Sequence, residues 1–133
     1  MKYFLDTNMC VYILKGMYIS VFEELISHHP SEIKIPSIVK AELYYGAEKS
    51  NKREETQQKI NNFLLPFEIV PFGETASVIY GEVRAELEKG GTPIGPNDLI
   101  IASVVLAEQG ILITNNVKEF TRIKQLRVEN WIK

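Results

Sequence analysis

Hydrophobic positions along the chain follow two patterns, short apolar runs and longer segments with apolar residues three or four positions apart. Short runs bounded by turn residues predict buried strands, because a strand covered on both faces of a sheet is apolar at nearly every position. These runs are Lys2–Leu5, Ile33–Ile35, Glu68–Phe72, Ile111–Thr114 and Leu126–Val128.

Segments with helical spacing separate these predicted strands. Gly16 ends the first segment and Gly90-Gly91 the longest, as is common for residues that close a helix. The predicted helices are Met9–Leu14, Ser20–His28, a helix that opens at Pro36-Ser37 and runs through Tyr45, a helix that follows the polar segment Lys49–Glu55 and ends near Leu65, Glu74–Lys89, and Leu99–Ala107. Strands alternating with helices predict an α/β sandwich with a mainly parallel sheet, and no linker divides residues 1–133.

Composition narrows the class of protein. With 45% hydrophobic and 24% charged residues, the chain has the proportions of an ordinary globular domain. Cys10 is the single cysteine, which excludes an internal disulfide and favours a reducing compartment. The N-terminus lacks the apolar region of a signal peptide, and the longest apolar stretch, Leu99–Ala107, is about half of what a bilayer requires. We therefore expect a cytoplasmic protein without membrane contact.

Net charge excludes a basic protein that coats any nucleic acid, because the whole chain carries a formal charge of -2. Basic residues nevertheless gather in two regions, and for any one of them a solvated helix face is the simpler interpretation. The two groups are Lys49, Lys52, Arg53 and Lys59, and then Lys118, Arg122, Lys124 and Arg127.

Acidic and amide residues follow the predicted strands. Asp6 ends the first strand, Glu42 lies in the helix after the second, Asp98 opens the apolar helix, and Asn116 and Glu119 follow the strand at Ile111–Thr114. Because ligands of parallel sheets bind outside the carboxyl ends of the strands, these positions are expected to meet at one edge.

Each position also has a purely structural interpretation. Asp6 can satisfy turn donors, Asp98 can cap its helix, and Glu119 can be solvent-exposed. His28 and His29, at a helix end, favour capping over catalysis. Glu42 is harder to explain in this way, since it is the only charge between Ala41 and Ala47 and an unpaired buried carboxylate is costly.

A cation would account for all the acids together, because crowded carboxylates cannot all ionise without compensation. Hard oxygen ligands select Mg²⁺ or Mn²⁺, and such ions promote hydrolysis at phosphoryl groups. No serine nucleophile motif, Walker loop or dinucleotide fingerprint competes for this role. Metal-assisted phosphodiester hydrolysis is therefore the predicted reaction class.

Motifs along the whole chain resemble those of a known family, the PIN-domain ribonucleases, and within it the VapC toxins of toxin-antitoxin pairs. The matching stretches are Phe4–Asn8, Ile38–Ala47, Gly95–Asp98, Ile113–Phe120 and Arg127–Trp131. The resemblance implies a three-layer α/β/α sandwich and a Mg²⁺-dependent endoribonuclease, with Mn²⁺ as a substitute. It also implies a VapB-type antitoxin that inserts a C-terminal segment into the active-site groove, and a homodimer.

The family's three recurrent acids correspond to Asp6, Glu42 and Asp98. Many relatives place an aspartate where this chain has Asn116, so Glu119 is the expected fourth acid. Asp6 and Asp98 are then expected to bind the metal directly, and Glu42 directly or through water. The residues expected to orient the carboxylates are Thr7, Asn8, Thr114 and Asn116.

The resemblance further implies a substrate, since similar relatives cut tRNA in the anticodon stem-loop, with initiator tRNA as the notable target. The residues expected to hold the flanking phosphates are Lys49, Lys52, Arg53, Lys118 and Arg122. An antitoxin helix is expected to cover Tyr12, Ile13, Tyr44 and Tyr45, which would otherwise be ordinary core residues.

Two other functions remain open from the sequence. A phosphatase of the haloacid dehalogenase type also starts with an aspartate after its first strand, but it needs a second acid where this chain has Asn8. A non-catalytic nucleic-acid-binding module of the same fold would tolerate the loss of Asp6, Glu42 and Asp98, yet all three are present.

Overall fold

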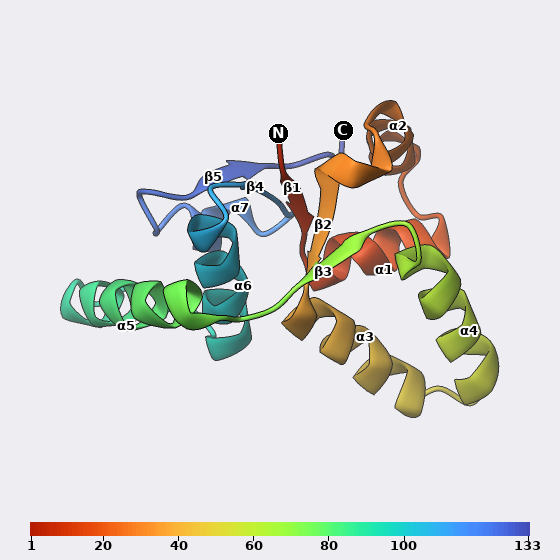
Figure 1. The fold of residues 1–133 in the computed structure, drawn as a ribbon, viewed down its shortest axis with the longest axis horizontal. Helices are drawn as coiled ribbons and strands as arrows, with labels where there is room; N and C mark the ends of the chain where they lie inside the picture. The colour runs from red at the N-terminus through yellow and green to blue at the C-terminus, as the bar shows by residue number, and fades with distance from the viewer.

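A five-stranded parallel sheet forms the centre of the protein in a computed structural model, which describes all 133 residues (Figure 1). Its strands follow the order β3-β2-β1-β4-β5. They are β1 (Tyr3–Leu5), β2 (Ile33–Pro36), β3 (Glu68–Val70), β4 (Ile111–Ile113) and β5 (Arg127–Glu129). All five predicted strands are confirmed, although β3 ends two residues earlier than predicted and β5 is shifted by one.

Helices cover both faces of the sheet, which confirms the three-layer sandwich. Figure 1 shows α5, α6 and α7 on one side of the strands and α1, α2 and α4 on the other. The helices are α1 (Thr7–Lys15), α2 (Ile19–Ser27), α3 (Ser37–Glu48), α4 (Arg53–Leu64), α5 (Glu74–Lys89), α6 (Pro96–Ala107) and α7 (Val117–Phe120). The sequence did not predict α7 or the 3-10 turn at Pro30–Glu32, because neither is long enough to show a period.

Capping residues set the ends of these helices and correct two predicted boundaries. Asp6 caps α1, so this helix starts at Thr7 rather than Met9. Pro96 occupies the first turn of α6, where its missing N–H costs nothing, so α6 starts three residues before the predicted Leu99. Gly16 closes α1 in the left-handed conformation with φ of 64°, as predicted.

The core is one cluster of 28 buried hydrophobic residues around β1, β2 and β4. Packing is close just before β4, where a Cβ on Gly110 would lie 2.6 Å from ring carbons of Phe4. The only buried residues with polar or charged side chains are Asp6, Ser103 and Thr114. Ser103 donates to the carbonyl of Leu99 in its own helix. Asp6 and Thr114 are therefore the two buried polar residues whose side chains are not explained by a bond within one helix.

The topology of the sheet places Asp6 and Thr114 at the point where the strand order reverses. From β1 the chain moves outward to β2 and β3, and it then returns to β4 on the other side of β1. In open α/β sheets the crevice for ligands lies at such a switch point, outside the carboxyl ends of the strands. Asp6 directly follows β1 and Thr114 directly follows β4.

No helix has the length and apolar character needed to cross a bilayer.

Candidate active site

Asp6 joins the two central strands at the switch point. Its Oδ1 accepts the backbone N–H of Met9 at 2.9 Å, and its Oδ2 accepts the hydroxyl of Thr114 at 2.5 Å. The residue is only 5% exposed. Burial raises the pKa of Asp6, the bonds from Thr114 and Met9 oppose that rise, and the charge of Glu42 adds to it. Asp6 therefore caps α1, as the structural interpretation held, and is also a buried carboxylate held by two neutral donors.

Glu42 reaches the same region from α3 and is held at both oxygens. Its Oε1 accepts the hydroxyl of Thr7 at 2.6 Å, and its Oε2 accepts the side-chain amide of Asn97 at 3.2 Å. The side chain is half-buried. Its burial is thus offset by two hydrogen bonds, from α1 and α6, rather than by an opposite charge.

Asp98 lies in the first turn of α6 and does not cap it, because the N-cap is Gly95 and no side chain bonds there. The pKa of Asp98 rises from 3.8 to about 7. Desolvation is the largest cause, followed by a hydrogen bond with Glu119 and by the charges of Glu119, Asp6 and Glu42. The structure therefore brings together all four acids that were predicted from the sequence.

Positive side chains do not compensate these four acids. None of the eight ion pairs in the structure includes Asp6, Glu42, Asp98 or Glu119. As the acids are placed, no three side chains of the ligating types surround a point where one ion could be held. The donor set suits Mg²⁺ all the same, because this ion keeps several waters and is usually bound through only one or two carboxylates.

The four residues expected to orient the acids fall into two pairs. Thr7 and Thr114 do so through their hydroxyls, and Thr114 also accepts the backbone N–H of Asn116 at 2.9 Å. Asn8 and Asn116 are exposed, and neither side chain makes a hydrogen bond within the protein. Asn97, which holds Glu42, was missed because an amide before a helix resembles an ordinary cap in the sequence.

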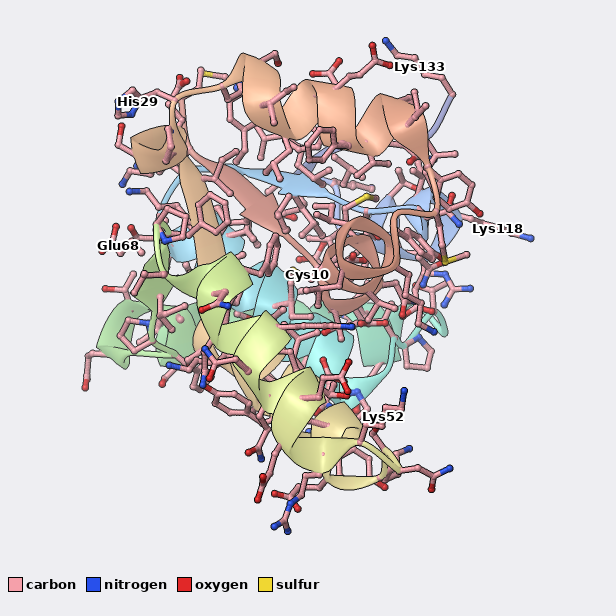
Figure 2. The ribbon with its side chains drawn as sticks, turned by 90° about the vertical axis from the view of Figure 1, so that its right-hand side faces the viewer. Cys10, His29, Lys52, Glu68, Lys118 and Lys133 are labelled. Atoms are coloured by element: carbon pink, nitrogen blue, oxygen red, sulfur yellow. The ribbon has the colours of Figure 1, made fainter.

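The basic residues expected to hold phosphates differ in whether their side chains already have a partner within the protein. Lys49, Lys52 and Lys118 are exposed and have no carboxylate partner, and Figure 2 shows Lys52 and Lys118 pointing away from the ribbon. The ammonium of Lys49 lies over the ring of Tyr45, 4.5 Å from its centroid. Arg53 pairs with Glu48 at 3.4 Å. Arg122 donates to the carbonyl of Pro93 at 2.8 Å and so ties the segment after α7 to the loop before α6.

Four residues were expected either to contact the antitoxin or to belong to the core, and they differ in how deeply they are buried. Tyr12, Ile13 and Tyr44 are half-buried against the core, whereas Tyr45 is 64% exposed. Both histidines lie at helix ends, as predicted. His29 caps the 3-10 turn and accepts the backbone N–H of Ser31. His28 is the C-cap of α2, and its ring also stacks on Trp131, with ring centroids 5.5 Å apart.

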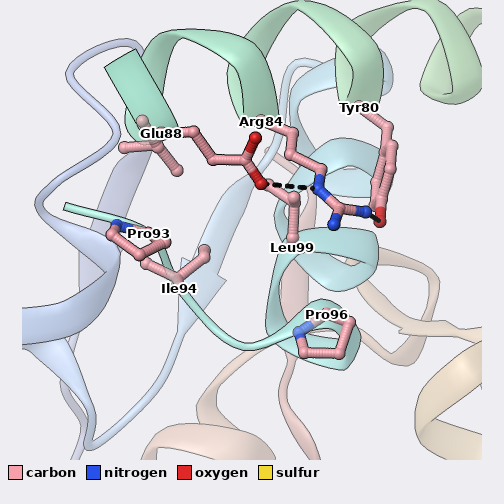
Figure 3. A pocket seen from close by; sticks show the side chains of 8 residues that line it. Tyr80, Arg84, Glu88, Pro93, Ile94, Pro96 and Leu99 are labelled. Carbon is pink, nitrogen blue, oxygen red and sulfur yellow. Dashed lines mark hydrogen bonds and ion pairs between the residues drawn. The ribbon is translucent and has the colours of Figure 1, made fainter. Parts of the chain in front are cut away.

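A cleft beside the acids is lined by α5 and by the loop that leads to Asp98 (Figure 3). It has a volume of about 210 Å³. Its charged groups satisfy each other, since Arg84 donates to Glu88 at 3.1 Å and to the hydroxyl of Tyr80 at 2.9 Å. None of the predicted site residues lines this cleft, which therefore lies outside the cluster of acids.

Metal-free protein is expected to lose stability as the pH rises from about 4 to about 7. Over this range folded Asp98 keeps a proton that the unfolded chain has released, because its folded pKa is about 7 against 3.8. The free energy of unfolding then falls with pH, and Asp6 adds to the trend in the same direction. Thermal unfolding at pH 5 and pH 8 measures the effect, with Asp98→Asn as the comparison. The variant should show a smaller difference, and equal differences would contradict this origin.

Comparisons with known proteins place the chain among its relatives. A family model described as PIN domain matches residues 3–126. The chain belongs to the PIN-domain family. A protein of Rickettsia felis named Ribonuclease VapC2 is 48% identical over the full length of both chains. A Salmonella typhimurium protein named tRNA(fMet)-specific endonuclease VapC is 36% identical over 98% of both.

Solved structures agree with this assignment. This PIN domain is similar to a chain in the crystal structure of VapBC2 from Rickettsia felis bound to a promoter DNA fragment, with a TM-score of 0.90, 47% identity and coverage of 98% and 99%. It is also similar to a chain in DNA-bound VapBC from Salmonella typhimurium, with a TM-score of 0.93, 36% identity and 98% coverage of both chains. The PIN domain here is therefore of the VapC ribonuclease type, as the resemblance implied.

Proposed function

We propose that this PIN domain is the Mg²⁺-dependent endoribonuclease toxin of a VapBC-type pair. The observation that carries the proposal is the gathering of Asp6, Glu42, Asp98 and Glu119 at the β1/β4 switch point without any positive side chain. Four acids from four separate segments, two of them with raised pKa values, are costly unless a cation is bound in the working state.

Asp6 and Asp98 are the proposed direct ligands, with Glu42 binding directly or through water. A divalent ion held there would make a bound water more acidic and would compensate charge on the phosphoryl group. Thr114 and Met9 fix both oxygens of Asp6, while Thr7 and Asn97 fix both oxygens of Glu42. These donors hold the carboxylates in position, as outer partners of ligands commonly do.

Glu119 takes the fourth acidic position in this proposal. After burial, a hydrogen bond with Glu119 and the charge of Glu119 help to raise the pKa of Asp98 to about 7. Asn116 contributes its backbone N–H to Thr114, so its part is to fix the hydroxyl that orients Asp6. An acid from α7 thus replaces the aspartate that many relatives carry at the position of Asn116.

The proposed substrate is tRNA, cut in the anticodon stem-loop, with initiator tRNA as the first one to test and inhibition of translation as the result. A relative that is 36% identical bears the name tRNA(fMet)-specific endonuclease. Lys49, Lys52 and Lys118 have no carboxylate partner and can hold phosphates around a splayed loop. Arg53 can do the same, because its exposed pair with Glu48 contributes little, whereas Arg122 is held by the carbonyl of Pro93.

Mapping new 5′ ends in total cellular RNA tests this substrate. Purified protein with Mg²⁺ is expected to cut in the anticodon loop of initiator tRNA, and the same reaction with EDTA serves as the control. Cuts confined to ribosomal or messenger RNA, with every anticodon loop intact, would refute the tRNA proposal and leave the ribonuclease proposal standing.

A VapB-type antitoxin is the proposed partner, since the similar solved structures are VapBC complexes. The half-buried Tyr12, Ile13 and Tyr44 and the exposed Tyr45 offer apolar surface for its helix. Expression of the chain alone is expected to arrest growth, and co-expression with the antitoxin encoded beside it should relieve the arrest. Failure of any adjacent product to bind would contradict the toxin role. A homodimer is also expected, which light scattering can test.

Neither alternative function gains support from the site. A phosphatase of the haloacid dehalogenase type needs a second acid at position 8, where the side chain of Asn8 is exposed and makes no hydrogen bond within the protein. A non-catalytic binding module does not account for the raised pKa values of Asp6 and Asp98.

A further inference from the structure

A groove between α1, α3 and α4 opens directly from the cluster of acids. It has a volume of about 480 Å³, within the range of small-molecule sites. Thr7 and Glu42 form its catalytic end, and Ser50 and Thr56 form the other. The groove is therefore continuous with the place where the scissile phosphate is proposed to bind.

The groove has an apolar floor and a positive rim. Its floor consists of Val11, Leu14, Leu43, Ala47 and Ile60. Lys15, from α1, is exposed and has no carboxylate partner, and Lys59, from α4, pairs with Glu55 only at 3.6 Å in a highly exposed contact. Such an exposed pair contributes little, so both lysines are available to an anion.

Gly46 keeps the groove open at a cost to its own helix. A glycine inside a helix is about 1 kcal/mol less favourable than alanine. The protein's own packing does not require it here, because a Cβ at Gly46 would meet no atom within 4 Å. A side chain at this position would project into the groove, so the missing side chain leaves room for something outside the chain.

We propose that this groove is a nucleotide subsite, which takes the base and phosphate next to the scissile bond of a single-stranded RNA segment. The base lies against the apolar floor, and Lys15 and Lys59 hold the neighbouring phosphate. The hydroxyls of Ser50 and Thr56, which lie 3.2 Å apart, can hydrogen-bond to the ribose. Charge complementarity favours RNA, since a polyanion meets Lys15, which has no partner, and Lys59, whose only pair is a weak exposed one. This inference rests on the proposed ribonuclease function and identifies part of its specificity.

Gly46→Leu tests the subsite because it fills the groove with a better helix former, and Gly46→Ala is the matched control. The substrate is an RNA oligonucleotide that spans the mapped cleavage position, intact or with one abasic ribose on either side of the scissile phosphate. For the wild type, removing the base on one side should lower kcat/KM about tenfold, the scale of one apolar pocket contact. Gly46→Leu should show the same loss on intact RNA and no further loss on the abasic RNA.

Direct Mn²⁺ binding, followed by electron paramagnetic resonance, should be equal for Gly46→Leu and the wild type, which separates the groove from the metal ligands. Lys15→Gln and Lys59→Gln should each reduce the slope of log affinity against log salt by about 0.7, whereas Lys89→Gln, outside the groove, should not.

Unchanged kinetics of Gly46→Leu, or an abasic effect that persists in it, would overturn the subsite. Unchanged RNA kinetics with loss of antitoxin binding would assign the groove to the protein partner and overturn it equally. A wild type that cuts no RNA with Mg²⁺ would instead refute the proposed function itself.

Discussion

Asp6→Asn and Asp98→Asn should each lower RNA cleavage by about a thousandfold or more, because several kcal/mol of charge stabilisation in the transition state depend on a metal site they disrupt. Each substitution keeps the shape of the side chain and removes its charge. Asp6 and Asp98 have raised pKa values, so loss of their charge should not unfold the protein and should raise its thermal stability at pH 8 without metal.

The measurement is kcat/KM on the mapped RNA across a Mg²⁺ titration, with circular dichroism to confirm folding. Glu86→Gln is the matched control, since Glu86 is exposed on α5 and makes no ion pair. Cleavage near the wild-type rate by both aspartate variants at matched metal concentration would refute the assignment of these acids.

Thr114→Val should lower both the stability of the protein and its catalytic activity. Thr114 is fully buried, and its hydroxyl donates to Asp6 and accepts the backbone N–H of Asn116. Valine has the same shape but leaves both groups without a partner, at a cost of about 1–3 kcal/mol in the free energy of unfolding. Catalysis should fall about 10- to 100-fold, as for other residues that orient a metal ligand.

Urea denaturation and a Mg²⁺ titration of cleavage measure the two effects. Thr114→Ser keeps the hydroxyl and should restore most of the catalysis, although it loses a buried methyl group. If valine and serine at this position gave equal activities, Thr114 would act through packing alone, and the orienting role of its hydroxyl would be wrong.

The sequence was sufficient to predict the sheet because its signals are strong and local, whereas the set of four acids needed the resemblance, since each acid alone also had a structural interpretation. Buried parallel strands are apolar at nearly every position, and Asp6 and Asp98 each stand beside such a run or helix. The rule that ligands bind at the carboxyl ends of strands then supplies the tertiary proximity that local patterns lack.

Contacts between distant polar groups could not be predicted in the same way. Asn97 donates to Glu42, which lies 55 positions away in the sequence. Arg122 donates to the backbone carbonyl of Pro93, and since every residue has such a carbonyl, the sequence does not mark this one as the partner. Tyr45 has the composition of a core residue but lies on the outer face of α3, since the period of one short helix does not fix which side is covered. These features follow from how the elements pack, which no single segment encodes.

Metal-dependent cleavage of structured RNA is the most direct test of the proposed ribonuclease. Purified protein is incubated with a tRNA pool and Mg²⁺, with EDTA in a parallel reaction, and with p-nitrophenyl phosphate as an alternative substrate. The account predicts discrete internal cuts that require the metal, and no turnover of the small ester. Intact RNA in every reaction, or turnover of p-nitrophenyl phosphate without RNA cleavage, would contradict it.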